Sequence, residues 1–370
     1  MIVDSSLIKN INKYIEGLQR DKHFDFSPVN VGITKHGNNL KLGFSCYALK
    51  LLFITKKWDQ LNSQKQNEWI SFINSFQANL LNLPQNSFVD KVFINDYKSF
   101  NFNKSAKSLI KKTLNIFDLY SYEKPYKVLE NNIRAESKQA IATLFQVNEK
   151  NKLDYLDFQQ EDEEINKFLN SFNWNKPWHA GAQFSALCVF NKTQLNGTKR
   201  EKGIGALNNF IESKLDIDTG MYFENTLPSG SESINGSMKV LTGLDWIDTP
   251  IHFPEKLIDF CLLNEPSSEG CDLVDAVYVL YRCSKQTNYK RKEINNYFNK
   301  LQKIILSHYK SDEGGFSYYI NRSQEYYYGL KITDGQNRAD IHGTLLLLWA
   351  LSMIYDFQNE ENELFNIIKP

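Results

Sequence analysis

ADIHGTLLLLWALSMI, residues 339–354, is apolar around nearly its whole circumference when it is placed on a helix. A helix without a polar face is buried on all sides. Its polar residues Asp340 and His342 stand at its beginning, where Asp also suits a helix N-terminus. This stretch therefore predicts a buried helix whose polar start lies at one end of the hydrophobic core.

Five other stretches have the same character, with small or polar residues followed by an apolar helix. They are residues 43–54, 134–147, 179–190, 233–244 and 271–283. The segments between them show the i, i+3, i+4, i+7 pattern of amphipathic surface helices. These segments are residues 7–19, 66–81, 161–172, 201–215, 255–263 and 292–309.

The two kinds of helix alternate six times along the chain. An amphipathic helix covers a buried one on one face and meets water on the other, so the pattern predicts six outer helices around six inner ones. We expect an all-α fold, an (α/α)6 toroid of six helical hairpins, with residues 1–370 in a single domain. The second connection is an insertion at residues 83–131, in which a further helix is expected at 105–117.

The last connection is a Tyr-rich loop at residues 311–336. It is longer than the about two to eight residues usual between packed helices, and long loops of this kind often bind ligands. We expect it to fold over the mouth of the barrel; the alternative is that its tyrosines pack it onto the outer surface. Residues 87–94 and 314–320 suit short strands or extended turns, which are too few to build a sheet.

Composition limits the classes of partner and compartment. The chain has 370 residues with 43 Lys plus Arg and 43 Asp plus Glu, so no nucleic-acid partner held by bulk charge is expected. Its five cysteines are scattered, and its N-terminus lacks the pattern of a signal peptide. No apolar run is long enough for a transmembrane segment. These features predict a cytoplasmic protein with reduced thiols.

Two patterns resemble the α/α toroid superfamily that contains the terpenoid cyclases and the protein prenyltransferase β subunits. The first is a glycine followed by aromatic residues, in DTGMYF at 218–223 and DEGGFSY at 312–318. The second is the pairing of LVDAVY at 273–278 with DIHGT at 340–344. The resemblance implies the toroid fold and an enzyme with an apolar, aromatic-walled cavity.

The resemblance also has departures that bear on cofactors. Asp275 and His342 match two of the three zinc ligands of the prenyltransferase β subunits, but Val277 stands where that family has its cysteine. The Asp-x-Asp-Asp acid motif of the cyclases is absent. The zinc ligand set is therefore incomplete, and no cofactor or metal is assigned. Zinc stays an open alternative, with His179, His342, Asp275 and Cys271 as the side chains that could bind it.

The polar residues at the starts of the inner helices predict one shared site. A ring of helices that begin at the same end brings such groups into one bowl, where buried carboxylates and imidazoles suit acid–base catalysis. The predicted catalytic residues are Glu136, His179, Asp275, Asp340 and His342. The predicted substrate-binding residues are Arg134, Gln183, Asn235, Arg338, Tyr222, Phe316, Tyr318 and Tyr327. The alternative roles are a helix cap for Asp340 and an ion pair between Arg134 and Glu136.

We expect a small-molecule or oligosaccharide ligand in the polar-ringed central cavity. Three functions stay open at this point, of which the first is the one that we expect and the other two are alternatives. The first is an enzyme of the terpenoid cyclase or prenyltransferase kind, which needs a dry aromatic wall. The second is a carbohydrate-active toroid, such as a glycosidase, polysaccharide lyase or epimerase, which needs a polar cleft. The third is a non-catalytic binding scaffold, for which the barrel would be filled.

Overall fold

A computed structural model describes residues 3–20, 24–80, 83–98 and 125–370. These residues are mostly helical and their strands are only two residues long, which confirms the all-α prediction. All six apolar stretches form helices. They are α3 (Leu42–Ile54), α7 (Pro125–Gln146), α9 (Pro177–Gln194), α11 (Gly230–Trp246), α13 (Gly270–Ser284) and α15 (Ile341–Gln358).

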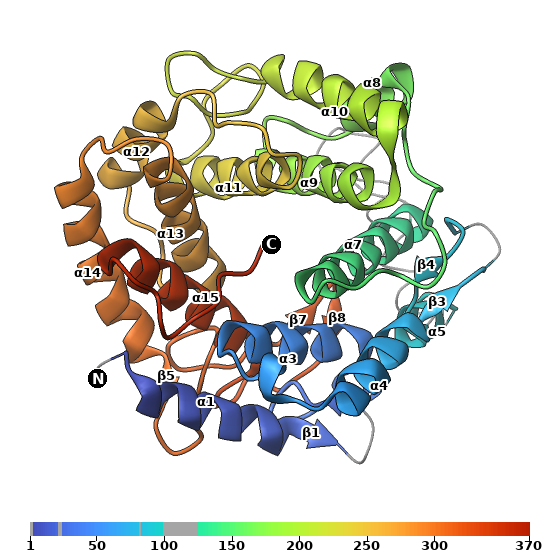
Figure 1. The fold of residues 1–370 in the computed structure, drawn as a ribbon, viewed down its shortest axis with the longest axis vertical. Coiled ribbons are helices and arrows are strands. Elements are labelled where there is room, and N and C mark those ends of the chain that lie inside the picture. Colours follow the sequence, from blue (N-terminus) through green and yellow to red (C-terminus); the bar gives the residue numbers. More distant parts are fainter. Residues whose placement is uncertain (1–2, 21–23, 81–82, 99–124) are drawn as a thin grey trace, which may run out of the picture.

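These six helices surround the middle of the molecule (Figure 1). Each packs against the next in the order α3, α7, α9, α11, α13 and α15, and α15 packs against α3, so the contacts close into a cycle. Their burial follows from their composition: along α3 every residue except Phe53 is buried. A helix predicted to be apolar around its whole circumference, such as α3, is therefore packed on all sides in the structure.

The amphipathic helices lie outside this cycle (Figure 1). They are α1 (Ser5–Leu18), α4 (Ser63–Asn74), α8 (Asp162–Leu169), α10 (Gly197–Glu212), α12 (Pro254–Leu263) and α14 (Arg291–Ser307). In α1 the buried residues Leu7, Ile11, Tyr14, Ile15 and Leu18 recur every three or four positions, as one apolar stripe requires. The two largest differences from the predicted bounds are that α4 ends at Asn74 and that α7 begins nine residues before 134.

Four two-stranded antiparallel ribbons and three short helices complete the described chain. The ribbons pair β1 (Gln19–Arg20) with β2 (Asp25–Phe26), β3 (Gln77–Ala78) with β4 (Ser87–Phe88), β5 (Tyr309–Lys310) with β6 (Gly315–Phe316), and β7 (Tyr326–Tyr327) with β8 (Leu330–Lys331). The short helices are α2 (Lys35–Asn39), η1 (Trp58–Gln60) and α5 (Lys91–Lys98). Strand structure within 87–94 is thus limited to its first two residues. The helix predicted at 105–117 lies outside the described residues.

The loop at 311–336 packs across the starts of α3 and α15 and the middle of α7. Tyr327 is buried against Phe44 of α3, and its hydroxyl reaches Glu136 of α7. A Cβ atom at Gly43 would collide with the Tyr327 ring, so glycine there permits this docking. Tyr326 points away and is 56% exposed. The loop therefore covers this end of the inner helices, with its tyrosines divided between packing and solvent.

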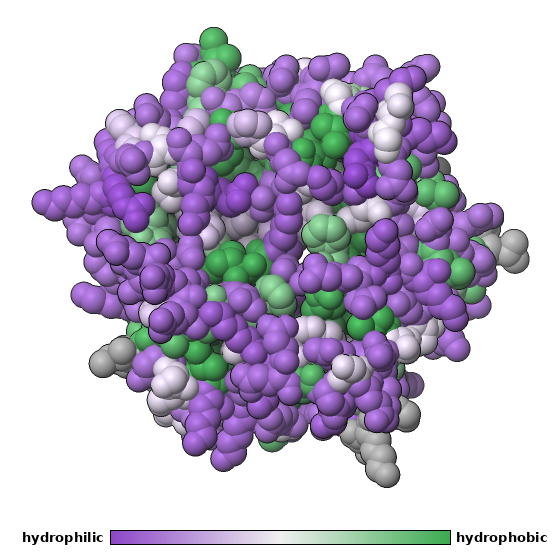
Figure 2. All heavy atoms as spheres, viewed as in Figure 1, coloured by the Kyte–Doolittle hydropathy of each residue, from purple (hydrophilic) through white to green (hydrophobic). Residues whose placement is uncertain are grey.

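The buried apolar side chains of the described residues form one continuous cluster that includes both helix layers. The face shown in Figure 2 is mainly hydrophilic, with small separate hydrophobic patches. No described helix has the length and apolar character needed to cross a membrane.

Candidate functional site

A cavity of about 530 Å³ lies inside the cycle of inner helices. Side chains of α3, α7, α9 and α11 line it, together with Tyr328 from the β7–β8 turn and Pro370. This volume falls within the range of about 300–1,000 Å³ typical of small-molecule sites. The barrel is therefore not filled by its own side chains.

The C-terminal segment closes one end of this cavity, and the chain ends near the centre of the ring (Figure 1). The Asn366 amide donates to the carbonyl of Ile54, the last residue of α3, and the Lys369 amide donates to Gln146, the last residue of α7. Trp246, the last residue of α11, donates its indole N–H to Pro370. The segment thus covers the ends of the inner helices, and the other end of the cavity faces their starts.

Three lysines of the cavity wall come from three different inner helices. They are Lys50 of α3, Lys138 of α7 and Lys239 of α11. Lys50 is only 8% exposed, and burial lowers its pKa. Burial and the charges of Lys239 and Lys50 together lower the pKa of Lys138 to about 7. The Lys138 ammonium group is therefore close enough to those of Lys50 and Lys239 to be repelled by both.

His179 stands at the start of α9, where it is exposed and lines the cavity. Its Nε2 atom lies 3.5 Å from Nε2 of Gln183, one turn further along α9, and its ring meets Phe172 edge-on at 5.5 Å. Trp178 lines the same wall and is 42% exposed. The structure thus places two predicted site residues, His179 and Gln183, beside an accessible aromatic ring.

Glu136 is fully buried within α7, next to the cavity. The hydroxyl of Tyr327 donates a hydrogen bond to its Oε1 atom, while Oε2 has no partner among the described residues. Gln139, which lines the cavity, donates to the Tyr327 hydroxyl at 3.3 Å. Burial raises the pKa of Glu136 to about 8, and the bond from Tyr327 opposes that rise. Glu136 is consequently mostly protonated at neutral pH.

His342 belongs to a column of stacked rings. It stacks on Tyr47 with 4.8 Å between ring centroids and on Tyr318 at 5.7 Å, and its Nδ1 atom lies 2.6 Å from Oε1 of Gln324. Burial and the charge of Lys239 lower the pKa of His342 to about 3. The imidazole is therefore neutral at any ordinary pH, and Tyr47 links it to Tyr327 through a ring contact at 6.0 Å.

The two predicted aspartates have different surroundings. Asp340 is the N-cap of α15: its carboxylate accepts from the amides of Gly343 and Tyr318, each at 2.7 Å, and from that of Gln324 at 3.2 Å. With these three bonds the Asp340 carboxylate holds the start of α15 and the neighbouring loop in place.

Asp275 is 1% exposed and its Oδ2 atom has no partner among the described residues. Burial raises its pKa to about 7, and the charge of Lys239 opposes that rise.

The remaining predicted residues divide between the cavity and other places. Arg134 lines the cavity but also lies over the Phe168 ring and 3.7 Å from Glu130. Asn235 donates to Asp272 at 2.8 Å. Three others contact partners elsewhere: Tyr222 bonds His252, Arg338 pairs with Glu313 and Asp312, and Phe316 packs against Tyr309. No described side chains of His, Cys, Asp and Glu form a group that could hold a metal ion.

We expect Glu136→Gln to remove a pH dependence of stability. The folded-state pKa of Glu136, about 8, lies above its ordinary value of 4.5, so its protonated form stabilises the fold fully below that ordinary value. The contribution is lost as the pH rises through the folded-state pKa, at about 1.4 kcal/mol for each pH unit between the two.

Urea unfolding of both proteins at several pH values measures this effect. The free energy of unfolding of the variant, relative to that of the wild type, should increase as the pH rises from about 5 to about 8. Above that pH the difference should stay constant. Glu149→Gln, at an exposed position just beyond α7, is the matched control and should give no such gain. A constant difference between Glu136→Gln and wild type would show that Glu136 is ionised in the folded protein.

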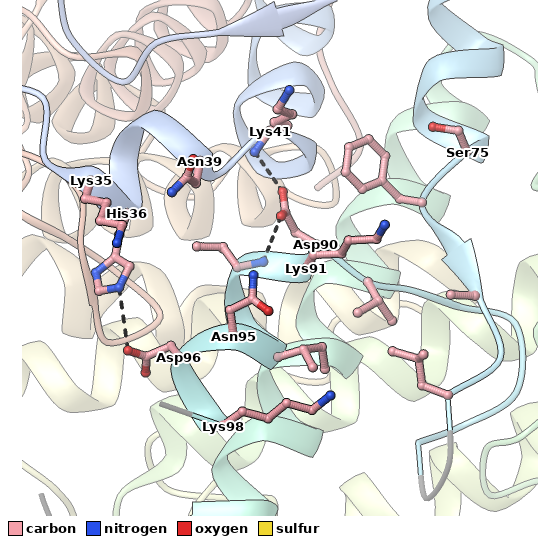
Figure 3. A pocket seen from close by; sticks show the side chains of 16 residues that line it. Lys35, His36, Asn39, Lys41, Ser75, Asp90, Lys91, Asn95, Asp96 and Lys98 are labelled. Carbon is pink, nitrogen blue, oxygen red and sulfur yellow. Dashed lines mark hydrogen bonds and ion pairs between the residues drawn. The ribbon is translucent and has the colours of Figure 1, made fainter. Parts of the chain in front are cut away.

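A second, larger hollow lies on the outer surface between α2 and α5 (Figure 3). Its volume is about 870 Å³, and its histidine and its two aspartates have structural partners. His36 lies 3.6 Å from Asp96, and Asp90 accepts from the Lys41 and Leu42 amides at the start of α3. The hollow borders Leu80 and Lys98, where the description of the chain stops. Because its histidine and both of its carboxylates already have partners in the fold, the central cavity is the stronger candidate site.

Sequence reasoning missed the three cavity lysines. Lys50 and Lys239 are each the only charged residue of their stretch, GFSCYALKLLFI or SINGSMKVLTGL, whereas Lys138 shares RAESKQAIATLFQV with Arg134 and Glu136. A lone lysine on a helix expected to be buried on all sides is itself a signal, because burying an unpaired charge is costly.

A comparison of this chain with models of protein families, with curated proteins and with solved structures finds no match.

Proposed function

We propose that this chain is an (α/α)6 toroid of six hairpins in one domain, and an enzyme that binds a carbohydrate in its central cavity. The closed cycle of inner helices, with the amphipathic helices outside it, supports the toroid. The observation that carries the function is the polar wall of the cavity, to which Lys, His, Asn and Gln side chains contribute. Sugars need such hydrogen-bonding groups, whereas a hydrocarbon does not.

The aromatic residues support the same choice. Trp178 and Tyr328 line the cavity and are each 42% exposed, so a sugar ring can stack on them. Tyr318 and Tyr327, expected at an aromatic wall, are instead buried against other rings. A terpenoid cyclase would need those rings around an open, dry cavity to stabilise carbocations. The resemblance to that superfamily therefore supports the fold more than the reaction.

The wall also favours one kind of carbohydrate chemistry. Among the described residues that line the cavity there is no Asp or Glu, so the carboxylate pair of a typical glycosidase has no counterpart there. His179 and Tyr328 offer a base and an acid at the accessible end. We therefore place the enzyme with the lyases or epimerases, in which His179 transfers a proton to or from the sugar.

Calorimetric titration with neutral sugars, acidic sugars and farnesyl diphosphate tests this proposal. We expect a sugar to bind and Trp178→Leu to weaken its binding by about tenfold, the value of a lost aromatic stacking contact. Leu263→Ala, at an exposed position on α12, is the control and should leave binding unchanged. For a sugar that is turned over, His179→Ala should lower kcat by about 10²–10⁴. Binding of farnesyl diphosphate without binding of any sugar would contradict the proposal.

A further inference from the structure

Lys50, Lys138 and Lys239 have no charged partner in the described part of the chain. None forms an ion pair or a side-chain hydrogen bond with a described residue, although other lysines such as Lys192 and Lys285 do. Lys50 is more than nine-tenths buried and lines the cavity. An unpaired ammonium group away from bulk water is costly, and the charges of Lys50 and Lys239 also repel that of Lys138. An anion that enters the cavity relieves this cost, which otherwise lowers the pKa values of Lys50 and Lys138.

The nearest buried carboxyl groups do not neutralise these charges. The charge of Lys239 acts on Asp275 without an ion pair between the two, and the raised pKa of Asp275, about 7, leaves this carboxyl group only partly ionised. Glu136 is bound to Tyr327, and its pKa of about 8 leaves it mostly neutral. Lys138, with a pKa of about 7, is itself only partly protonated at neutral pH, but Arg134 also lines the cavity and no described Asp or Glu does. The wall therefore keeps a net positive charge.

The same wall offers acceptors and donors for the rest of a ligand. Gln183 is 6% exposed, and its Oε1 atom has no hydrogen-bond partner among the described residues. It lies one turn along α9 from His179 and lines the cavity. An orphaned buried acceptor beside three orphaned cations is typical of a site built for a ligand with both hydroxyl and anionic groups.

We propose that the ligand carries an anionic group and that Lys50, Lys138 and Lys239 bind it in the central cavity. The group is the carboxylate of an acidic sugar or the phosphate of a sugar phosphate, since both present oxygens that accept from ammonium groups. This identification of the ligand as a sugar rests on the function proposed above. Gln183 accepts a hydrogen bond from a hydroxyl of the same ligand.

The test replaces each of the three lysines by methionine, which keeps the length of the side chain and removes its charge. Inorganic phosphate, glucuronate, glucose 6-phosphate and glucose are the probes, titrated by calorimetry at fixed ionic strength. We expect the anionic probe that binds the wild type to bind each variant at least tenfold more weakly. Lys303→Met, at an exposed position on α14, is the matched control and should bind like the wild type.

A second readout separates a binding role from a structural one. Without ligand, Lys50→Met should unfold at a higher temperature than the wild type, because the variant no longer buries an unpaired charge. Addition of the anionic probe should raise the unfolding temperature of the wild type but not that of the variant. A merely structural lysine would instead lower the unfolding temperature when replaced, and that result would overturn the inference.

The probes also separate failure of this inference from failure of the proposed function. Preference for glucuronate or for glucose 6-phosphate identifies the anionic group as carboxylate or phosphate. If glucose binds as well as the acidic sugars and the lysine variants bind like the control, the inference is wrong while the carbohydrate proposal stands. If phosphate binding depends on the lysines and no sugar binds, the anion site stands and the carbohydrate proposal fails.

Discussion

Asp340→Ala is expected to lower the free energy of unfolding by about 4 kcal/mol, because it removes three hydrogen bonds at once. Its carboxylate accepts from the amides of Gly343, Tyr318 and Gln324, and the residue is 2% exposed. It therefore caps α15 and also fastens the loop at 311–336 to the start of that helix. Buried amides that lose their acceptor find no water to replace it.

Urea unfolding followed by circular dichroism measures this loss. Asp4→Ala is the matched control, because Asp4 caps α1 at an exposed position through the Ser6 and Leu7 amides and should cost only about 1 kcal/mol. Asp340→Asn keeps one carbonyl oxygen and should lie between the two. If Asp340→Ala costs no more than Asp4→Ala, the loop is not fastened through this carboxylate.

Gly343→Ala is the second large effect that we expect, at about 3 kcal/mol or more. A Cβ atom there would overlap the backbone of Ser317 and Tyr318, and a backbone cannot rotate aside as a flexible side chain does. The loop would have to move away from α15, and Tyr318 would lose its place beside His342.

Gly205→Ala makes the same chemical change, but we expect it to raise the free energy of unfolding instead of lowering it. Gly205 lies in α10, where a Cβ atom would meet nothing within 4 Å, so alanine should stabilise the helix by about 0.5–1 kcal/mol. Thermal unfolding of both variants compares the two directly. Similar effects of the two substitutions would show that the loop does not pack closely on the start of α15.

The helices were predictable because burial on all sides and burial on one side leave different patterns in sequence. In α3 (42–54) only one residue is half-exposed, which is burial on all sides. In α1 only one stripe of residues is buried, which is burial on one side. Helix ends were less predictable. The start of α7, for example, lies nine residues before its apolar part, so the apolar pattern does not mark it. The sequence offered two roles for Asp340, a catalytic residue and a helix cap. The three amides that donate to its carboxylate show that it caps α15.

The site was less predictable because it depends on contacts between distant residues. Tyr327 bonds Glu136 across a separation of 191 residues, and no local pattern encodes that pairing. His179 and Gln183 were found because they stand at a helix start, as the ring of inner helices requires. The lysines lie further along their helices, away from the mouth of the cavity. Their long side chains nevertheless reach the cavity wall, so a search at the helix starts did not find them.

A crystal structure of the protein soaked with glucuronate tests the central claim most directly. We predict electron density for the sugar inside the cycle of inner helices, with its carboxylate among Lys50, Lys138 and Lys239 and its ring against Trp178. Density only in the outer hollow between α2 and α5, or an empty central cavity in a protein that binds the sugar in solution, would contradict the account.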